Sequence, residues 1–227
     1  MNYRRLLPNS ISSLSLIFGV LSIFKTMEGD FFYAPVFIIL AVIFDSLDGR
    51  AARVLGVGGG DFGKEVDSLC DMSSFGVAPA IMIYKYGLLD LGIGGQIIAS
   101  LFAVGGCMRL ARFNCNTGLV HGYFQGMPIP AGACFLATYV LSGYQFTPIV
   151  LAGITLVVAI IMYSNVRFPD FKGKGNPMYL LPVVIALIIG IGMLYQRLQG
   201  WPFVIMFTYT LAGILNHIYR LVTGKNK

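Results

Sequence analysis

Long apolar stretches alternate with short polar breaks along almost the whole chain. The breaks fall at glycine, proline and clusters of charged residues, and most stretches have roughly the 17 to 25 residues that a helix needs to cross a hydrocarbon layer. We predict eight membrane-spanning helices, near residues 11–26, 31–53, 65–86, 91–111, 128–144, 147–166, 178–195 and 202–221. The predicted fold class is an all-α, polytopic transmembrane helical bundle, with residues 1–227 forming one integral-membrane domain.

The composition supports this class and excludes two others. Of the 227 residues, 56% are hydrophobic and 11% are charged, whereas a soluble domain has about 25% charged residues. Disordered chains combine low hydrophobicity with high charge, so the chain is not one of them. The formal net charge is +6, but the basic residues lie between apolar stretches. We therefore expect membrane lipids as partners and no nucleic acid.

The basic residues also predict an orientation. If the chain crosses the membrane eight times and both termini are cytoplasmic, thirteen of the 16 Lys and Arg residues face the cytoplasm, and only Lys25, Lys85 and Arg197 lie outside. Such a bias is the rule for membrane proteins. Fusing the fifth and sixth stretches would give seven spans and move the basic cluster at residues 167–174 outside. Eight spans in the cell membrane, with both termini cytoplasmic, are therefore favoured.

Acidic residues gather in one short part of the chain. Six of the ten carboxylates fall between residues 45 and 71, and four of them interrupt apolar helices: Asp45, Asp48, Asp67 and Asp71. A carboxylate at membrane depth is costly, which indicates a functional site. Spacings of three and four residues place each pair on one helix face. Since a short glycine-rich connection joins the two helices, we expect them to be antiparallel and the four carboxylates to converge near the cytoplasm.

Four ionised carboxylates need a counter-charge, because like charges a few ångströms apart repel strongly. Divalent cations that prefer oxygen ligands, Mg²⁺ or Mn²⁺, are the expected partners, and two ions suit four carboxylates better than one. Such ions also favour a phosphorylated substrate. Nearby, Gly49 and Ala52 leave the helix surface bare for a ligand or for a close helix crossing. Arg53 either neutralises a diphosphate or serves as a cytoplasmic topology charge.

The pattern Asp45-x2-Asp48-Gly49-x2-Ala52-Arg53, followed by Gly63-x3-Asp67-x3-Asp71, resembles the signature of the CDP-alcohol phosphatidyltransferases. Nine residues separate Arg53 from Gly63, one more than in the family's pattern, and the extra residue falls in the glycine-rich loop. The resemblance implies a phosphotransferase of phospholipid biosynthesis. Such an enzyme moves a phosphatidyl group from a CDP-linked lipid, either CDP-diacylglycerol or an archaeal ether analogue, to an alcohol and releases CMP.

The resemblance also implies roles for individual residues. The four aspartates would hold two Mg²⁺ or Mn²⁺ ions that bridge the diphosphate, and Asp71 would also be the base that deprotonates the acceptor hydroxyl. A positioned carboxylate is a plausible general base. The residues implied to contact the nucleotide or the diphosphate are Pro8, Asn9, Ser10, Gly49, Ala52, Arg53 and Gly63.

Residues 66–80, 108–114 and 126–132 resemble the phosphatidylserine synthase subgroup. This resemblance implies L-serine as the acceptor and phosphatidylserine as the product. The residues that we expect near the acceptor are Lys64, Ser74, Arg109, Arg112, Asn114, Gln125 and Arg167. Among them Arg112 is favoured for the serine carboxylate or the diphosphate. For each basic residue, the interpretation as a charge that holds anionic lipid headgroups is equally favoured. For Ser74, the alternative interpretation is a contact between helices.

The resemblance extends over roughly residues 4–132. We therefore expect residues 1–132 to form the catalytic part and residues 133–227 to add further transmembrane helices, which either build a homodimer interface or complete the bundle. The main alternative function is a member of the same family with glycerol 3-phosphate or an inositol phosphate as acceptor. A cation-coupled transporter is the alternative of a different class, and the lack of an internal repeat disfavours it.

Overall fold

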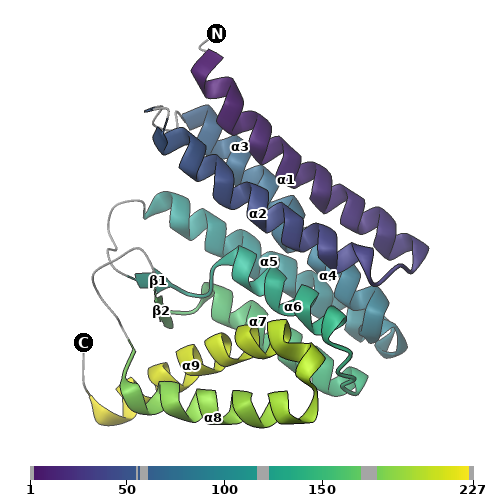
Figure 1. Ribbon diagram of the computed structural model, residues 1–227, viewed down its shortest axis with the longest axis vertical. Coiled ribbons are helices and arrows are strands. Elements are labelled where there is room, and N and C mark those ends of the chain that lie inside the picture. The colour runs from purple at the N-terminus through teal and green to yellow at the C-terminus, as the bar shows by residue number, and fades with distance from the viewer. Residues whose placement is uncertain (1–2, 55, 57–60, 117–122, 170–177, 225–227) are drawn as a thin grey trace.

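The computed structural model describes residues 3–54, 56, 61–116, 123–169 and 178–224, without the side chains of residues 3–8, 49, 51–53 and 61 (Figure 1). The prediction of an all-α fold is confirmed, and each of the eight predicted ranges coincides with a helical segment. Seven of these segments are the helices α1 (Tyr3–Glu28), α2 (Tyr33–Val54), α5 (Ile93–Cys115), α6 (Ile129–Ser142), α7 (Pro148–Tyr163), α8 (Leu180–Gln196) and α9 (Trp201–Thr223).

The remaining segment is the third along the chain, and its helix is not uniform. It runs through α3 (Asp61–Asp71), η1 (Met72–Val77), α4 (Ala78–Ile83), η2 (Tyr84–Leu88) and the short 3-10 turn η3 (Leu89–Leu91). Both η1 and η2 are π-helical. Pro79 stands just after η1 and has no N–H to donate, so the helix must redistribute its backbone hydrogen bonds there. The first π-helical turn therefore begins directly after Asp71.

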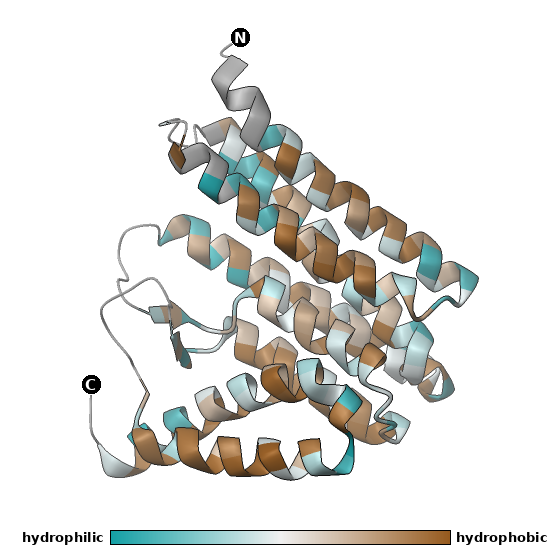
Figure 2. Ribbon diagram, in the orientation of Figure 1, coloured by the Kyte–Doolittle hydropathy of each residue, from teal (hydrophilic) through white to brown (hydrophobic). Residues whose placement is uncertain are grey.

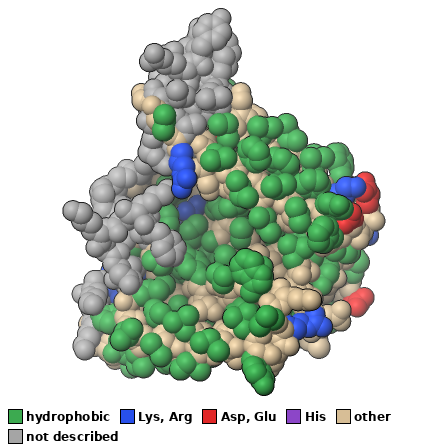
Figure 3. Space-filling model, viewed as in Figure 1, with side chains coloured by type: hydrophobic (Ala, Val, Ile, Leu, Met, Phe, Trp, Pro, Cys, Tyr) green, Lys and Arg blue, Asp and Glu red, His purple; other side chains and the backbone are tan. Residues whose placement is uncertain are grey.

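Several helices are long and apolar enough to cross a membrane. Among the described residues, four stretches meet this description: Asn9–Glu28, Phe62–Leu91, Ile93–Cys115 and Leu198–Thr223. The apolar helices Ile129–Ser142, Pro148–Tyr163 and Leu180–Gln196 are shorter. Apolar residues line the helices along most of their length (Figure 2), and green apolar side chains cover most of the face in Figure 3. This surface fits hydrocarbon and supports an integral membrane protein.

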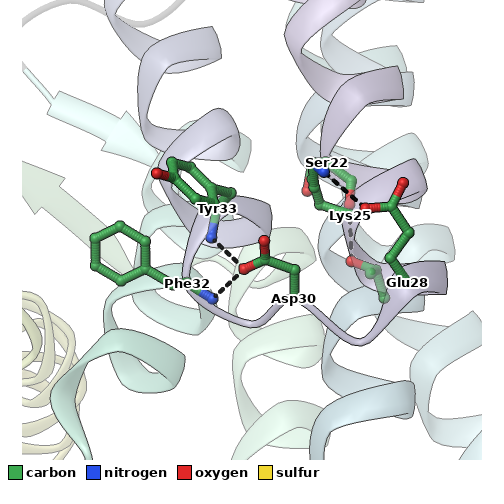
Figure 4. A network of polar contacts seen from close by, with 7 residues as sticks. Ser22, Lys25, Glu28, Asp30, Phe32 and Tyr33 are labelled. Atoms are coloured by element: carbon green, nitrogen blue, oxygen red, sulfur yellow. Dashed lines mark hydrogen bonds and ion pairs between the residues drawn. The ribbon is translucent and has the colours of Figure 1, made fainter.

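A capped turn joins the first two helices at the end of the bundle remote from the N-terminus (Figure 4). Lys25 and Glu28 form an ion pair of 2.7 Å in the last turn of α1. The Asp30 carboxylate then accepts hydrogen bonds from the backbone N–H groups of Phe32 and Tyr33, at 3.1 and 3.0 Å. Such bonds satisfy backbone donors that the first turn of a helix leaves without partners. The cap thereby fixes where α2 begins.

The helices pack both against their neighbours in the chain and against helices far away in the sequence (Figure 1). α1 lies along both α2 and α3, α5 packs against α7 and η1, α6 contacts α2 and α9, and α8 pairs with α9. Phe75, Phe102, Leu136 and Phe203 are all fully or almost fully buried in the core between them. The N-terminal helices, which carry the acidic residues, therefore form one side of the bundle, and the α8–α9 pair forms the other.

A small antiparallel sheet interrupts the helical fold, and the sequence pattern does not predict it. β1 (Tyr123–Gln125) pairs with β2 (Arg167–Pro169), with Tyr123 opposite Pro169. Phe168, at the centre of β2, is fully buried and packs against Gly213 of α9, where a Cβ atom would lie 2.4 Å from the Phe168 ring. The sheet thus connects the segments that follow α5 and α7 to the C-terminal helix.

Candidate active site

Three aspartates from two helices converge. Asp45 of α2 and Asp67 and Asp71 of α3 each offer a carboxylate oxygen, and these three oxygens all lie within 4.8 Å of one another. Asp45 and Asp67 are half-buried and Asp71 is buried. The Oδ1 atom of Asp71 is buried and has no hydrogen-bond partner among the described residues. Since burying an unsatisfied carboxylate oxygen is costly, this geometry points to a bound group that the site is built to receive.

Asp48 lies beside this cluster and has a partner of its own. It is buried and interacts electrostatically with Asp67. Its Oδ2 atom accepts a hydrogen bond of 2.5 Å from the Ser12 hydroxyl of α1. All four sequence-predicted aspartates therefore lie in one region, with α1 supplying a hydroxyl to one of them. Ser12 is not among the site residues predicted from the sequence.

Small and polar residues on one face of α1 explain why this helix comes close enough. Ser12, Ser15 and Ser22 are buried, and their spacings of three and seven residues place them on one helix face. The Ser74 hydroxyl of η1 donates to the Ser15 carbonyl oxygen over 3.0 Å. A Cβ atom on Gly19 would lie 2.8 Å from the Ser74 Cα. Small residues of this kind allow close helix contact in a membrane.

A buried arginine faces the acidic cluster from α5. Arg109 is 8% exposed and interacts electrostatically with Asp71 and Asp45. Its guanidinium also lies 5.2 Å from the centre of the Phe113 ring. Among the residues that sequence reasoning missed, Tyr209 of α9 interacts with Arg109 electrostatically, so the C-terminal helix reaches the edge of this site.

The structure places Arg112 in a different setting, one turn along the same helix. Its guanidinium donates hydrogen bonds of 2.6 to 3.3 Å to the carbonyl oxygens of Met162, Tyr163 and Ser164 at the end of α7, and one of 2.9 Å to the carbonyl of Gln125. It also lies over the Tyr163 ring. A cation at a helix C-terminus stabilises it. Arg112 therefore connects α5, α7 and β1.

Lys64 and Asn114 tie the start of α3 to the end of α5. The Lys64 ammonium donates to the Asn114 carbonyl oxygen over 2.9 Å, and the Asn114 side-chain amide donates to the Ser68 hydroxyl over 2.8 Å. Because the lysine caps a carbonyl at the end of α5, this contact holds α3 beside α5. It thereby fixes the position of the acidic helix relative to Arg109.

Of the other predicted acceptor residues, Ser74 lies in η1, whereas Gln125 and Arg167 are paired in the small sheet. Ser74 is fully buried in the contact with α1. This agrees with the alternative prediction for Ser74, that it makes a contact between helices. The Gln125 side chain donates to Asn165 over 2.7 Å. The Arg167 guanidinium lies 4.6 Å from the centre of the Tyr123 ring. Gln125 and Arg167 therefore belong to the small sheet.

The residues expected to bind the nucleotide lie on α1, α2 and α3. A Cβ atom on Gly63 would lie 3.2 Å from the Asn9 side-chain oxygen, so α1 and α3 meet there. Ser10 is exposed. The backbones of four further residues lie in α1 or α2, but their side chains are outside the described part of the chain: Pro8, Gly49, Ala52 and Arg53.

The donor set fits a divalent cation that prefers oxygen. Within the described residues, the cluster consists of carboxylates, which are the ligands that Mg²⁺ and Mn²⁺ favour. A cation between Asp45, Asp67 and Asp71 would offset their mutual repulsion and would give the Oδ1 atom of Asp71 a partner. The arrangement is therefore suited to holding a metal ion against an anionic group.

Comparison with known proteins agrees with this chemistry. Across 98% of this chain and 96% of its own length, the CDP-diacylglycerol–serine O-phosphatidyltransferase of Helicobacter pylori strain J99 is 34% identical. The archaetidylserine synthase of Methanothermobacter thermautotrophicus is 38% identical over 74% of this chain and 72% of its own. The CDP-diacylglycerol–serine O-phosphatidyltransferase of Bacillus subtilis is 35% identical over 76% of this chain and 93% of its own length. A family model for CDP-alcohol phosphatidyltransferase matches residues 5–167. The chain therefore belongs to the CDP-alcohol phosphatidyltransferase family and is a membrane-embedded phosphotransferase.

Proposed function

We propose that this enzyme transfers a phosphatidyl group from a CDP-linked lipid to the hydroxyl of L-serine, giving phosphatidylserine or its ether-lipid counterpart and CMP. The observation that carries the proposal is the convergence of Asp45, Asp67 and Asp71, with the buried Arg109 facing them. Relatives that cover most of the chain are named for serine transfer. Family membership gives no support to the transporter alternative.

Four aspartates are proposed to hold the cofactor. Asp45, Asp67 and Asp71 supply the closely spaced oxygens, and Asp48 lies next to Asp67. Two Mg²⁺ or Mn²⁺ ions bound there would neutralise the diphosphate and the charge that develops on departing CMP. The protein's own contribution is to keep the four carboxylates at one depth on two helices.

Asp71 is the proposed general base. In the transfer, the serine hydroxyl oxygen forms a bond to the phosphatidyl phosphorus, the bond from that phosphorus to the CMP oxygen breaks, and the hydroxyl proton passes to the Asp71 carboxylate. Within the part of the chain that the structure describes, the buried Oδ1 atom of Asp71 accepts no hydrogen bond, which suits a proton acceptor. General bases of this kind accelerate reactions by about 10² to 10⁴.

Arg109 is the proposed partner of the serine carboxylate. It is buried beside Asp71, so a carboxylate bound to it would lie near the base. The Arg112 guanidinium already contacts four carbonyl oxygens, and we therefore assign it a structural role in place of the expected acceptor contact. Lys64, Ser74, Asn114, Gln125 and Arg167 are proposed to shape the site through the contacts described above, not by touching serine.

The arginine positions favour serine over a phosphorylated acceptor. Glycerol 3-phosphate and inositol phosphate carry a dianionic group, which is best bound by several convergent cations. Within the described part of the chain, Arg109 faces the acids, whereas Arg112 and Arg167 lie against α7 and the Tyr123 ring. A single guanidinium matches the single carboxylate of serine.

The nucleotide site and the topology complete the proposal. We infer that the CMP portion contacts the N-terminal part of α1 and the end of α2, through Pro8, Asn9, Ser10, Gly49, Ala52, Arg53 and Gly63. The meeting of Asn9 and Gly63 supports this location. We further propose that residues 1–132 act with residues 133–227 as one domain in the cell membrane, with the active site facing the cytoplasm. A homodimer through the last helices is a further prediction.

An acceptor panel tests the proposed reaction. Purified full-length protein in lipid vesicles would receive a diacyl or an ether CDP-lipid together with labelled serine, glycerol 3-phosphate or inositol phosphate. We expect CMP release and labelled lipid only with serine, and the two donors would show which lipid class is used. Label entering lipid from glycerol 3-phosphate but not from serine would contradict the serine assignment while leaving the family intact.

A further inference from the structure

We propose that Ser12 is a positioning residue for the metal-binding carboxylates, acting through Asp48. This inference rests on the proposed function. The Ser12 hydroxyl of α1 donates to the Oδ2 atom of Asp48 over 2.5 Å, and the two residues lie 36 positions apart in the chain. Both are buried, with exposed fractions of 5% and 7%. The contact joins two helices at the acidic cluster.

The chemistry of this hydrogen bond gives it a specific effect. A hydroxyl that donates to a carboxylate forms a charge-assisted bond, which is shorter and stronger than a neutral one. A bond to one oxygen also fixes the rotation of the carboxylate about its Cβ–Cγ bond, so the direction of the other oxygen is set. Residues that hold metal ligands in this way change metal affinity about 10- to 100-fold when they are replaced.

The position of Asp48 explains why such a bond is needed. The three oxygens within 4.8 Å of one another come from Asp45, Asp67 and Asp71, so Asp48 lies at the margin of the cluster while repelling Asp67 electrostatically. The buried Ser12 hydroxyl donates to Asp48 and so offsets part of that repulsion. We infer that Ser12 holds the Asp48 carboxylate in the orientation that lets it join the other three aspartates around the ions.

The neighbouring serine provides a matched control. Ser13 is also on α1, but it is exposed, and its hydroxyl donates to the Asn9 carbonyl within the same helix. Ser13→Ala removes the same chemical group without touching an aspartate. Ser12→Thr keeps a hydroxyl at the critical position, and Ser12→Cys keeps the size while replacing the hydroxyl by a much weaker donor.

The experiment measures Mn²⁺ binding to purified full-length protein in detergent, without substrates, from the electron paramagnetic resonance signal of free Mn²⁺. Ser12→Ala and Ser12→Cys should weaken binding about 10-fold, whereas Ser12→Thr and Ser13→Ala should bind like the wild type. Because Ser12→Ala and Ser12→Cys also remove a buried hydrogen bond, these metal-free variants should unfold at a lower temperature than Ser13→Ala but remain folded at the temperature of the binding assay. In turnover assays, the Mg²⁺ concentration for half-maximal rate should rise more than kcat falls.

Wild-type Mn²⁺ affinity in both Ser12→Ala and Ser12→Cys would overturn the inference. So would a loss of Mn²⁺ affinity in Ser12→Thr and Ser13→Ala as large as the loss in Ser12→Ala. If Ser12→Ala does not fold, the Ser12→Cys variant decides. Failure of the wild-type protein to bind Mn²⁺ would instead remove the proposed metal centre itself. The two kinds of failure are therefore distinguishable.

Discussion

The helices at the two sides of the bundle bury opposite kinds of side chain. α1 buries hydroxyl groups such as those of Ser12 and Ser22, and it contacts the helices that carry the aspartates. α8 buries only Pro182, Ala186 and Gly190 and exposes apolar side chains on the rest of its surface. Lipid is as apolar as leucine, so an exposed apolar face needs no partner in a membrane. A buried polar group is costly without a partner, and Ser12 has its partner in Asp48 beside the acidic cluster.

The family match ends between these two sides of the bundle along the chain. It ends at residue 167, before α8 begins, while the Helicobacter pylori relative covers 98% of the chain. Among the described residues beyond the match, Tyr209 reaches the edge of the site through its interaction with Arg109. We expect changes near the acids to affect catalysis strongly and changes on α8 to affect it weakly.

We expect metal removal to have the largest effect, because it acts directly on the proposed metal centre on the N-terminal side of the bundle. Chelation by EDTA should abolish serine transfer, because the carboxylates of Asp45, Asp67 and Asp71 would then repel one another and the diphosphate. Addition of Mg²⁺ or Mn²⁺ should restore it. Labelled lipid formed before and after metal addition provides the measurement, and full activity in EDTA would contradict the account.

Asp71→Asn should lower kcat by about 10² to 10⁴, because an amide cannot accept the serine proton. Binding of the CDP-lipid should stay measurable. Asp90→Asn serves as the control, since Asp90 is exposed on η3, 19 positions further along the same segment. Single-turnover kinetics with both variants would check this. Equal rates in Asp71→Asn and the wild type would eliminate Asp71 as the base.

Arg109→Lys should raise the KM for serine about 10-fold while changing kcat less, because one charge-assisted hydrogen bond is worth roughly that factor and lysine lacks the planar guanidinium. Arg197→Lys is the control, since Arg197 is exposed and donates to the Gly143 carbonyl. Initial rates over a series of serine concentrations give both constants. A change in the KM for CDP-lipid alone would instead assign Arg109 to the donor.

The smallest effects concern packing, and two glycines allow a direct comparison. Gly19→Ala would place a Cβ atom 2.8 Å from the Ser74 Cα, whereas Gly190→Ala would place one 2.3 Å from the Thr208 hydroxyl, the end of a side chain that can rotate. We expect Gly19→Ala to cost about 1 to 3 kcal/mol of stability and to lower activity. Gly190→Ala should cost less and leave activity unchanged.

Gly153→Ala is the control for both glycine variants, since no described atom would lie within 4 Å of a Cβ atom at that position. Thermal unfolding in detergent, together with serine transfer, would check the comparison. Equal losses of activity in Gly19→Ala and Gly190→Ala would show that the two sides of the bundle contribute alike.

The sequence predicts the helices well, because spanning a membrane requires long apolar stretches whatever the tertiary structure. It also locates the four aspartates, since the spacings in each pair define a helix face. The π-helical turns and the β1–β2 sheet are absent from that prediction. The sheet pairs Phe124 with Phe168, two residues that are brought together only when α5, α6 and α7 have packed.

Contacts across the fold could not be predicted from the chain alone. Arg112 has the sequence features of a ligand-binding cation, but folding places the carbonyl groups at the end of α7 around it. Ser12 had a weak signal, because the first apolar stretch is rich in serine. Nothing in the sequence shows that this hydroxyl meets Asp48, since the partner is set by the crossing of α1 and α2.

The most direct test of the central claim is a crystal structure of the protein soaked in Mn²⁺, with the metal located by its anomalous scattering. The account predicts strong peaks between the carboxylates of Asp45, Asp67 and Asp71, with Asp48 as a further ligand. Mn²⁺ bound elsewhere, with these four carboxylates directed away from it, would contradict the account.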